Sequence, residues 1–375
     1  METVILFSFP AKREALRVAQ AAKGRLFEES RIQNSAGGLM MVKRLIQLSF
    51  CLFGLLGVVL MPAGAEASAE KLTFSIFFPP THAQAKMAID FAKEIEMRTQ
   101  NRVEITCFPG GTLTGASQVY DGVVNGISDL GNSCFAYTRG RFPVMAVVDL
   151  PLGYLNGLVA SRVADTFAME TRPEELDDVK VLYVHAHGPG LLHTRKPVQT
   201  LEDLKGMKIR ATGLSAKIVE ALGAVPVAMP QGGTYEALQK GVVEGTFGPI
   251  EVLKGWKQGE VIQYTTECFN VGYTTAMFVV MNLQKWNALP DDIKKIIDAA
   301  SREWVDVHGR AWDDADREGR EYTLGLGNKI IPLSPEESSK WRAAVKPVID
   351  DYIETTPDGQ THVDRIQGIL NKYQP

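Results

Sequence analysis

The amino-acid sequence predicts a layered α/β fold, on three observations. Residues 72–135 and residues 204–249 each alternate short apolar strands with amphipathic helices, an order that is typical of helices packed on a sheet. The 375 residues are enough for two domains or lobes with full cores. The composition is that of an ordinary globular protein, with 45% hydrophobic and 22% charged residues. Because the net charge is -4 and no long basic run is present, we expect no nucleic-acid partner.

The N-terminal segment, residues 1–69, is expected to be an upstream extension followed by a signal peptide. Lys43 and Arg44 precede an apolar run of 17 residues that ends at Met61, and small residues follow as far as Ala69. A basic region, an apolar region and an A-x-A site mark a cleaved export signal, so we expect a periplasmic protein. An uncleaved anchor is the alternative, although the run is shorter than the roughly 20 residues of a spanning helix.

The first 39 residues would bury this signal inside the chain. The paired methionines Met40 and Met41 indicate that translation starts there instead. A long basic region before the apolar run is the alternative.

The first half of the exported chain begins with a strand and a helix. The strand Leu72–Phe78 is stopped by Pro79 and Pro80, and Thr81 is expected to cap the helix that follows. This helix carries an apolar stripe at helical spacing, namely Met87, Ala88, Phe91, Ala92 and Ile95. The predicted elements of this half are the strands Leu72–Phe78, Arg102–Phe108, Asp129–Phe135 and Val179–His185 and the helices Thr81–Arg98 and Ser117–Asn125.

The second half is organised around the strand Met207–Ala211. Met207 and Ile209 point to one face of this strand, so Lys208 and Arg210 point to the other. A later apolar and β-branched run is long enough to cross between two lobes as one strand. The predicted elements of this half are the strands Met207–Ala211, Val225–Met229 and Thr265–Asn282 and the helices Ser215–Leu222, Tyr235–Lys240, Asp291–Gly319 and Pro335–Glu354.

Arg210 is the leading candidate for a binding residue. Its guanidinium is always charged and fits a carboxylate with two parallel hydrogen bonds. It lies near the end of a predicted strand, where open α/β sheets place their ligand crevices. An exposed surface arginine is the alternative, because charged residues are mostly exposed.

Three segments together resemble one family, the solute-binding proteins of tripartite ATP-independent periplasmic (TRAP) transporters. They are LKGMKIRATG around Arg210, YEALQKGVVEG from Tyr235 to Gly245, and VMN from Val280 to Asn282 with the later Trp286 and Leu289-Pro290. The resemblance runs from about Leu72 to the C-terminus. It implies a two-lobed periplasmic binding protein fold, with a cleft between the lobes, a crossover strand and long C-terminal helices.

The resemblance also implies lobe boundaries, a ligand and partners. Lobe I would comprise residues 70–190, completed by about 275–315, and lobe II residues 191–274, completed by about 316–375. The arginine that matches Arg210 would bind the carboxylate of an organic acid. The acid would be delivered to the small and large integral membrane subunits of a transporter, by a monomer without a cofactor.

Further residues are expected at the cleft. Phe78 and Tyr137 lie at predicted strand ends followed by loops, where clefts open. For the aromatic residues, packing in the core is the alternative, and for Glu251 a solvated surface position. The full set of expected ligand-binding residues is Arg210, Phe78, His82, Tyr137, His187, Tyr235, Gly248 and Glu251.

Two departures from the sialic-acid-binding branch of the family narrow the class of ligand that we expect. Gly248 stands where that branch has a ligand-binding asparagine, and Gly188-Pro189-Gly190-Leu191 where it has a second arginine. A large sugar acid is therefore disfavoured, and a smaller, more apolar monocarboxylate is favoured.

Motifs for catalysis or metal binding are absent from the sequence. It holds no GxSxG, HExxH or GxxxxGK[ST] pattern, so we expect no enzyme. His185 and His187 could be a metal pair, structural residues or ligand contacts, but a zinc site needs a third ligand. Asp314 and Asp316 resemble the start of a calcium loop, but its closing glutamate is missing, and a solvated acidic helix face is expected. We therefore expect no metal.

The three cysteines that remain after the expected cleavage are Cys107, Cys134 and Cys268. They allow at most one disulfide within a monomer, and we expect them to be buried as small hydrophobic residues. Two other functions stay open, a periplasmic enzyme acting on a carboxylate and a ligand sensor for a receptor. Turnover assays would identify the first, and the absence of neighbouring genes for two membrane subunits would favour the second.

Overall fold

Two β-sheets organise the structure, a computed structural model that describes residues 69–374. The expected upstream extension and signal peptide therefore lie outside the described residues, apart from Ala69. The first sheet has the strand order β2-β1-β3-β10-β4. β1 pairs parallel with β2 and β3, and β10 runs antiparallel between β3 and β4. Its strands are β1 (Glu70–Ile76), β2 (Val103–Phe108), β3 (Leu130–Cys134), β4 (Val179–Ala186) and β10 (Ala276–Asn282).

The second sheet has the strand order β11-β9-β5-β8-β6-β7. β6 pairs parallel with β7 and β8, while β5 is antiparallel to both β8 and β9. Its strands are β5 (Leu191–Thr194), β6 (Lys208–Ala211), β7 (Val225–Ala228), β8 (Gly245–Gly248), β9 (Tyr264–Glu267) and β11 (Lys329–Pro332). We call the parts built on the first and second sheets lobe I and lobe II; their expected residue boundaries stay a prediction.

Helices cover both sheets. α3 packs on β2, α5 and α11 pack on β4, and α7 packs on β6 and β7. The α-helices are α3 (Ala83–Arg98), α4 (Val119–Val124), α5 (Gly157–Thr171), α6 (Leu201–Leu204), α7 (Leu214–Ala221), α8 (Thr234–Gln239), α9 (Val252–Gly255), α10 (Leu283–Ala288), α11 (Asp291–Gly325), α12 (Pro335–Thr355) and α13 (Gly359–Tyr373). The 3₁₀ helices are η2 (Phe135–Tyr137), η3 (Met145–Asp149), η4 (Glu174–Leu176), η5 (Gln231–Gly233) and η6 (Gln258–Glu260).

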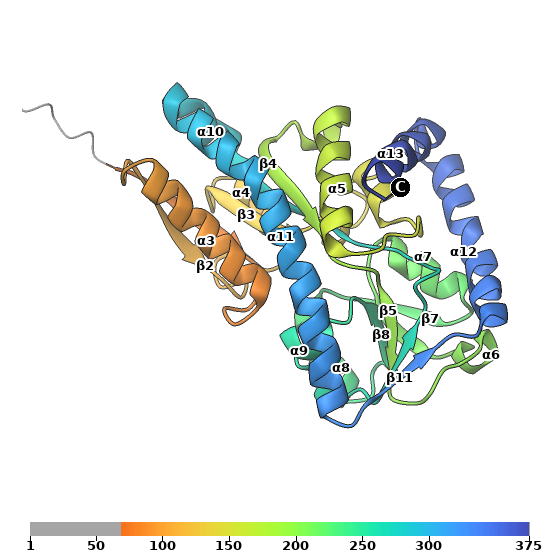
Figure 1. Cartoon of the computed structure of the whole chain (residues 1–375). Helices are drawn as coiled ribbons and strands as arrows, with labels where there is room; N and C mark the ends of the chain where they lie inside the picture. The colour runs from red at the N-terminus through yellow and green to blue at the C-terminus, as the bar shows by residue number, and fades with distance from the viewer. Residues whose placement is uncertain (1–68, 375) are drawn as a thin grey trace, which may run out of the picture. The chain divides into compact units, whose positions relative to one another are not determined.

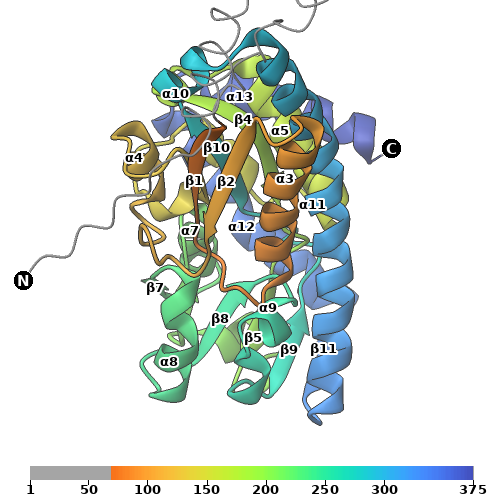
Figure 2. The ribbon, with the colours of Figure 1, turned by 90° about the vertical axis from the view of Figure 1, so that its left-hand side faces the viewer.

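The longest helix, α11, extends along both lobes (Figures 1 and 2). It contacts α3, α5 and β4 in lobe I and α9 and β11 in lobe II. At about 1.5 Å per residue its 35 residues span roughly 50 Å. Its apolar stripe buries Ile293, Ile297 and Ala300. It begins at Asp291 but continues six residues past the predicted end, to Gly325.

Two short segments cross between the lobes side by side. Residues 187–190 join β4 to β5, and residues 268–275 join β9 to β10. The backbone N–H of Gly190 donates to the carbonyl of Tyr273 at 2.9 Å, and the Thr274 hydroxyl donates to the carbonyl of His187. The crossings therefore form one hydrogen-bonded strap between the two sheets.

The structure corrects two of the predicted elements. The run from Thr265 to Asn282 is not one strand, because it is divided into β9 of lobe II and β10 of lobe I. Thr81 does not cap α3, because His82 is the N-cap and its side chain accepts from the N–H of Gln84. The predicted stripe of α3 is otherwise confirmed, with Ala88, Phe91, Ala92 and Ile95 buried.

The cysteines of the described residues form no disulfide. Cys107, Cys134 and Cys268 are all free thiols, with Cys134 and Cys268 buried and Cys107 half-buried. Among residues 69–374, no helix combines the length and the apolarity needed to cross a membrane.

Candidate functional site

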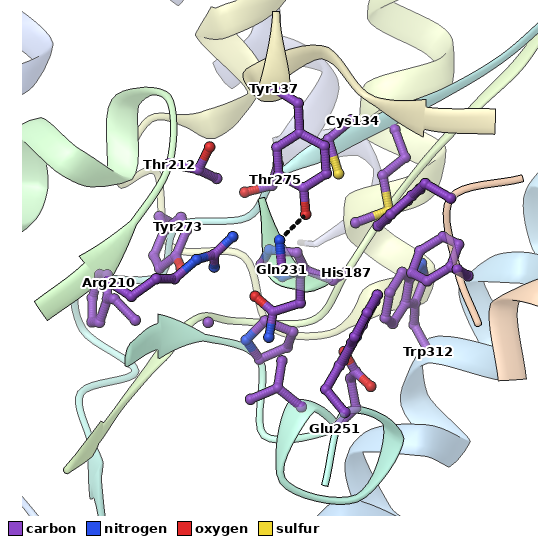
Figure 3. Close-up of a pocket in the computed structure, with 18 residues that line it drawn as sticks. Cys134, Tyr137, His187, Arg210, Thr212, Gln231, Glu251, Tyr273, Thr275 and Trp312 are labelled. Carbon is purple, nitrogen blue, oxygen red and sulfur yellow. Dashed lines mark hydrogen bonds between the residues drawn. The ribbon is translucent and has the colours of Figure 1, made fainter. Parts of the chain in front are cut away.

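A pocket lies between the lobes, where strands of both sheets end (Figure 3). Crevices beyond the carboxyl ends of strands are where open α/β sheets bind ligands. Lobe I supplies the residues that follow β1 and β3, and lobe II supplies those at the ends of β6 and β8. The lining residues are Phe77, Phe78, Cys134, Tyr137, His187, Arg210, Thr212, Gln231, Phe247, Gly248, Pro249, Glu251, Val252, Trp256, Tyr273, Thr275, Met277 and Trp312.

Arg210 lies on β6 and is only 4% exposed. Its Nε donates to the carbonyl oxygen of Met229 at 3.0 Å. No carboxylate of the described residues lies within 4.0 Å of its guanidinium. Figure 3 shows the guanidinium extending into the pocket. The alternative that Arg210 is an exposed surface arginine is therefore excluded. The pocket contains a buried cation that has no protein counter-charge within this distance in the described part of the chain.

Aromatic rings form one wall of the pocket. Phe77 and Phe78 lie with their ring centroids 3.9 Å apart, and Trp256 lies 6.1 Å from Phe77. Trp312 of α11 meets Phe78 edge-on at 5.8 Å. Such rings offer a flat apolar surface to a ligand.

Glu251 and His82 bridge the two lobes. Glu251 lies after β8 and is 2% exposed, and its Oε2 is 2.9 Å from Nε2 of His82, which lies after β1. Nδ1 of His82 accepts from the N–H of Gln84, so Nε2 carries the proton and donates to the carboxylate. Gly255 leaves room for this pair, since a Cβ there would lie 2.4 Å from Oε2 of Glu251.

A second bridge joins Tyr137 and Gln231. The backbone N–H of Gln231 in lobe II donates to the hydroxyl oxygen of Tyr137 in lobe I at 3.2 Å (Figure 3). Burial raises the pKa of the Tyr137 phenol far above its usual value, so the phenol stays protonated. The side-chain Nε2 of Gln231 is buried and has no hydrogen-bond partner in the described structure, which leaves a donor for a ligand.

His187 lies just beyond the end of β4, in the first crossing. Its Nδ1 is 2.5 Å from the carbonyl oxygen of Gly188. Burial lowers the pKa of the imidazole to about 4, helped by the Arg210 charge and opposed by the Gly188 hydrogen bond. His187 is therefore neutral at physiological pH.

Asp316 of α11 is not on a solvated helix face, which corrects the prediction for that residue. Its Oδ1 accepts from the backbone N–H of Glu251 at 3.1 Å, and a Cβ on Gly188 would lie 2.1 Å from its Oδ2. Burial raises its pKa well above the usual value, and the nearby Glu251 charge raises it further. α11 thus contacts the lobe-bridging residues directly.

The expected site residues divide into three groups. Six of them line the pocket, namely Arg210, Phe78, Tyr137, His187, Gly248 and Glu251. His82 lies behind the lining, stacked on Phe78 with 4.6 Å between ring centroids. Tyr235 does not line the pocket, because α8 directs its hydroxyl to Glu260 at 3.1 Å instead.

Several lining residues were not expected from the sequence. Gln231 lies two residues after a predicted strand that ends at Met229, so the strand-end argument that selected Arg210 could also have found it. Trp312 and Tyr273 gave no such signal. They lie in the middle of a helix and in a crossing, and only the packing of the lobes brings them to the pocket.

His185 has a structural position behind this wall. It stacks on His308 with 4.2 Å between ring centroids and accepts at Nδ1 from Nε1 of Trp312 at 3.1 Å. Burial lowers the pKa of both histidines. Within the described part of the chain, no group of three or more His, Cys, Asp or Glu residues is placed to hold a metal ion.

Comparison with known proteins gives one consistent result. Residues 74–355 match the family described as bacterial extracellular solute-binding protein, family 7. A solved TRAP periplasmic solute-binding protein from Desulfovibrio salexigens is 33% identical, with a TM-score of 0.73, over 82% of this chain and 97% of that one. One from Rhodoferax ferrireducens, in complex with copurified benzoate, is 28% identical, with a TM-score of 0.77, over 81% and 98%. The C4-dicarboxylate-binding periplasmic protein of Rhodobacter capsulatus is 26% identical over 78% and 89%.

Proposed function

The chain belongs to family 7 of the bacterial extracellular solute-binding proteins, and from this premise we propose that it captures an organic carboxylate between its lobes and delivers it to a TRAP-type membrane permease. The observation that carries the proposal is the buried, unpaired Arg210 guanidinium. A buried charge is costly unless it is paired. A ligand carboxylate supplies the missing partner with two parallel hydrogen bonds.

The lining favours a small monocarboxylate, aromatic or short and aliphatic. Arg210 is the one Arg or Lys among the lining residues, and Glu251 would repel a second carboxylate. The aromatic wall suits an apolar ligand body. At Gly248 a Cβ would meet nothing closer than 3.7 Å, so no side chain supplies the polar contact that a sugar acid would use there. The benzoate complex of the Rhodoferax relative is consistent with this class.

Capture would proceed by closure of the lobes around the strap formed by the two crossings. The bridges between Tyr137 and Gln231 and between His82 and Glu251 join opposite lobes, so both would form on closing. The ligand shifts this equilibrium only if it binds the closed state better than the open state. Closure also excludes water, which strengthens the pair between Arg210 and the carboxylate.

The partners and the location follow from the same family membership. We propose delivery to small and large integral membrane subunits by a periplasmic monomer. Its export would use the signal within residues 1–69, and cleavage would leave a mature chain that begins between Glu66 and Glu70. We propose neither an enzymatic activity nor a cofactor.

Identification of the bound ligand tests this function. The protein would be purified from its host periplasm without added ligand, and the small molecules released on denaturation would be identified by mass spectrometry. We expect a monocarboxylate, and titration calorimetry of refolded, ligand-free protein should show that it binds. Recovery of a neutral solute, or tighter binding of sialic or hexuronic acids than of every small monocarboxylate tested, would contradict the proposal.

A further inference from the structure

The hydrogen-bonding state of His187 is fixed by the backbone next to it. Its Nδ1 faces the carbonyl oxygen of Gly188, and a carbonyl oxygen can only accept, so Nδ1 carries the proton. The ring is neutral because its pKa is lowered to about 4. A neutral imidazole has one N–H and one bare nitrogen. Nε2 of His187 is therefore a hydrogen-bond acceptor.

This acceptor has no hydrogen-bond partner within residues 69–374, although His187 is only 4% exposed. The segment that carries it is held firmly, because the Thr274 hydroxyl donates to the His187 carbonyl. Because His187 lines the pocket, closure around a ligand would take this acceptor out of water, which is costly unless the acceptor gains a partner. The protein pays no such cost when a bound molecule donates to Nε2.

A donor without a partner lines the same pocket. Nε2 of Gln231 is buried and has no acceptor in the described structure. Arg210 is close enough that its charge lowers the pKa of His187, and Figure 3 shows Arg210, Gln231 and His187 around the centre of the pocket. The pocket thus brings together a cation on Arg210, an acceptor on His187 and a donor on Gln231.

A hydroxyl group donates one hydrogen bond and accepts another at the same oxygen. Resting on the proposed function, we propose that the ligand is a 2-hydroxy acid, whose carboxylate binds Arg210 and whose hydroxyl donates to Nε2 of His187 and accepts from Nε2 of Gln231. A 2-oxo acid would bring a carbonyl oxygen against the His187 acceptor, and an acid without a substituent would leave both groups unpaired. Sites built around a substrate hydroxyl discriminate strongly against analogues that lack it.

Three phenyl-substituted acids of similar size test this inference, and two aliphatic acids repeat part of the test. Mandelate carries a 2-hydroxyl, phenylglyoxylate a 2-oxo group, and phenylacetate neither; lactate and pyruvate repeat the first contrast. Calorimetry on ligand-free protein should show the hydroxy acid of each pair binding roughly 5- to 150-fold more tightly, the range for leaving one buried polar group unpaired. Equal or tighter binding of the 2-oxo acids would overturn the inference.

Two variants assign the preference to its residues. His187→Phe keeps an aromatic ring but removes the acceptor, and Gln231→Met keeps the length of the chain but removes the donor. His187→Phe should abolish most of the preference for mandelate over phenylglyoxylate, because only the hydroxyl can donate to Nε2 of His187. Gln231→Met should abolish most of the preference for mandelate over phenylacetate, because both mandelate and phenylglyoxylate can accept from Nε2 of Gln231. A preference that survives in both variants would overturn the inference. If one variant fails to fold, the other variant still tests the inference. So does the binding of mandelate against phenylglyoxylate, and of lactate against pyruvate, by the wild-type protein.

Arg210→Ala distinguishes a failure of this inference from a failure of the proposed function on which it rests. It should weaken all five acids alike, since it removes the carboxylate partner. Acids that bind wild type without a hydroxyl preference, and that are lost in Arg210→Ala, would leave the proposed function standing and overturn the 2-hydroxy assignment. If no acid binds wild type, the proposed function itself is overturned.

Discussion

Arg210 shows how one residue can carry a binding site. The Arg210 side chain is 96% buried without an acidic partner in the described residues, and its planar fork matches the geometry of a carboxylate. Lysine offers the same charge as a point, without the fork. In the proposed ligand complex the arginine would therefore contribute both charge and orientation.

Arg210→Ala should weaken binding of the native ligand by roughly 2–5 kcal/mol, the range for removing one partner of a buried charge pair. At about 1.4 kcal/mol per decade this is roughly 30-fold to several thousand-fold. Arg210→Lys should recover part of the loss, as measured by calorimetry. The matched control is Lys208→Ala, an exposed cation on the same strand, which should bind as wild type does. Binding by Arg210→Ala within about threefold of wild type would mean that Arg210 is not the anchor.

The buried carboxyl group of Asp149 should make the stability of the fold depend on pH. It lies at the end of η3, is 4% exposed, and its Oδ1 accepts from the backbone N–H of Ala276 in β10 at 3.0 Å. Burial raises the pKa of this carboxyl to about 8, while the Ala276 hydrogen bond lowers it. Between the ordinary aspartate pKa and about 8, the folded state therefore binds a proton that the unfolded state does not.

Stability contributed by Asp149 should thus fall as pH rises through this window, by up to about 1.4 kcal/mol per pH unit. Asp149→Asn is the neutral isostere, and it should flatten the fall. Urea unfolding of both proteins between pH 6.5 and 8, above the lowered pKa values of the buried histidines, measures the difference. Parallel pH profiles for the two proteins would show that Asp149 is already ionised in the fold.

At the scale of elements, the strap between the lobes depends on the close approach of the Tyr273 ring to the backbone of Gly190. The Tyr273 ring lies over Gly190, and a Cβ there would be 1.8 Å from Cε1 of that ring. Tyr273 also stacks on Phe247, with centroids 4.7 Å apart, and both line the pocket. Gly190 is therefore required for packing, and the position of an aromatic ring in the site depends on it.

Gly190→Ala should destabilise the fold by about 1–3 kcal/mol, the usual cost of overpacking, and should weaken ligand binding because Tyr273 must move. Denaturant unfolding and calorimetry measure the two effects. The control is Gly368→Ala in α13, where a Cβ would meet nothing within 4 Å; it should be neutral or stabilising by up to about 1 kcal/mol. A fully stable Gly190→Ala protein with normal affinity would contradict this account of the strap.

At the scale of the whole molecule, His82 couples folding and lobe closure. It caps α3 through Nδ1 and donates to Glu251 of the other lobe through Nε2. The first contact lies within lobe I and would persist in an open form, whereas the second would exist only when the lobes are closed. The two roles can be separated, because asparagine is a good N-cap but is too short to reach Glu251.

His82→Asn should leave the unfolding free energy of the ligand-free protein nearly unchanged and weaken ligand binding roughly 5- to 150-fold, since closure would leave a buried carboxylate oxygen unpaired. His82→Ala should show the same loss of binding and a further destabilisation of about 1 kcal/mol from the missing cap. Small-angle X-ray scattering with ligand should show both variants less closed than wild type. Unchanged affinity and unchanged closure in His82→Asn would remove this pair from the closing mechanism.

The sequence by itself determined the local elements and selected the proposed anchor. Short apolar runs located β1, β2, β3 and β6, and an apolar stripe at helical spacing located α3, because side-chain periodicity reflects which face of an element is buried. Arg210 could be selected because its chemistry and its place at a strand end are both visible in the sequence. Family membership and the two-lobed fold were also predicted correctly.

The tertiary structure alone decided how distant elements meet. The strands β5, β8 and β11 lack the alternation of apolar and polar residues that β6 shows, and they exist because sheet partners supply their hydrogen bonds. The run from Thr265 to Asn282 divides around Asn270 and Gly272, the latter at a positive φ of 50°, where the chain leaves one sheet for the other. Trp312 reaches the pocket, and Tyr235 does not, because burial there depends on contacts between residues far apart in the chain, which local sequence patterns do not encode.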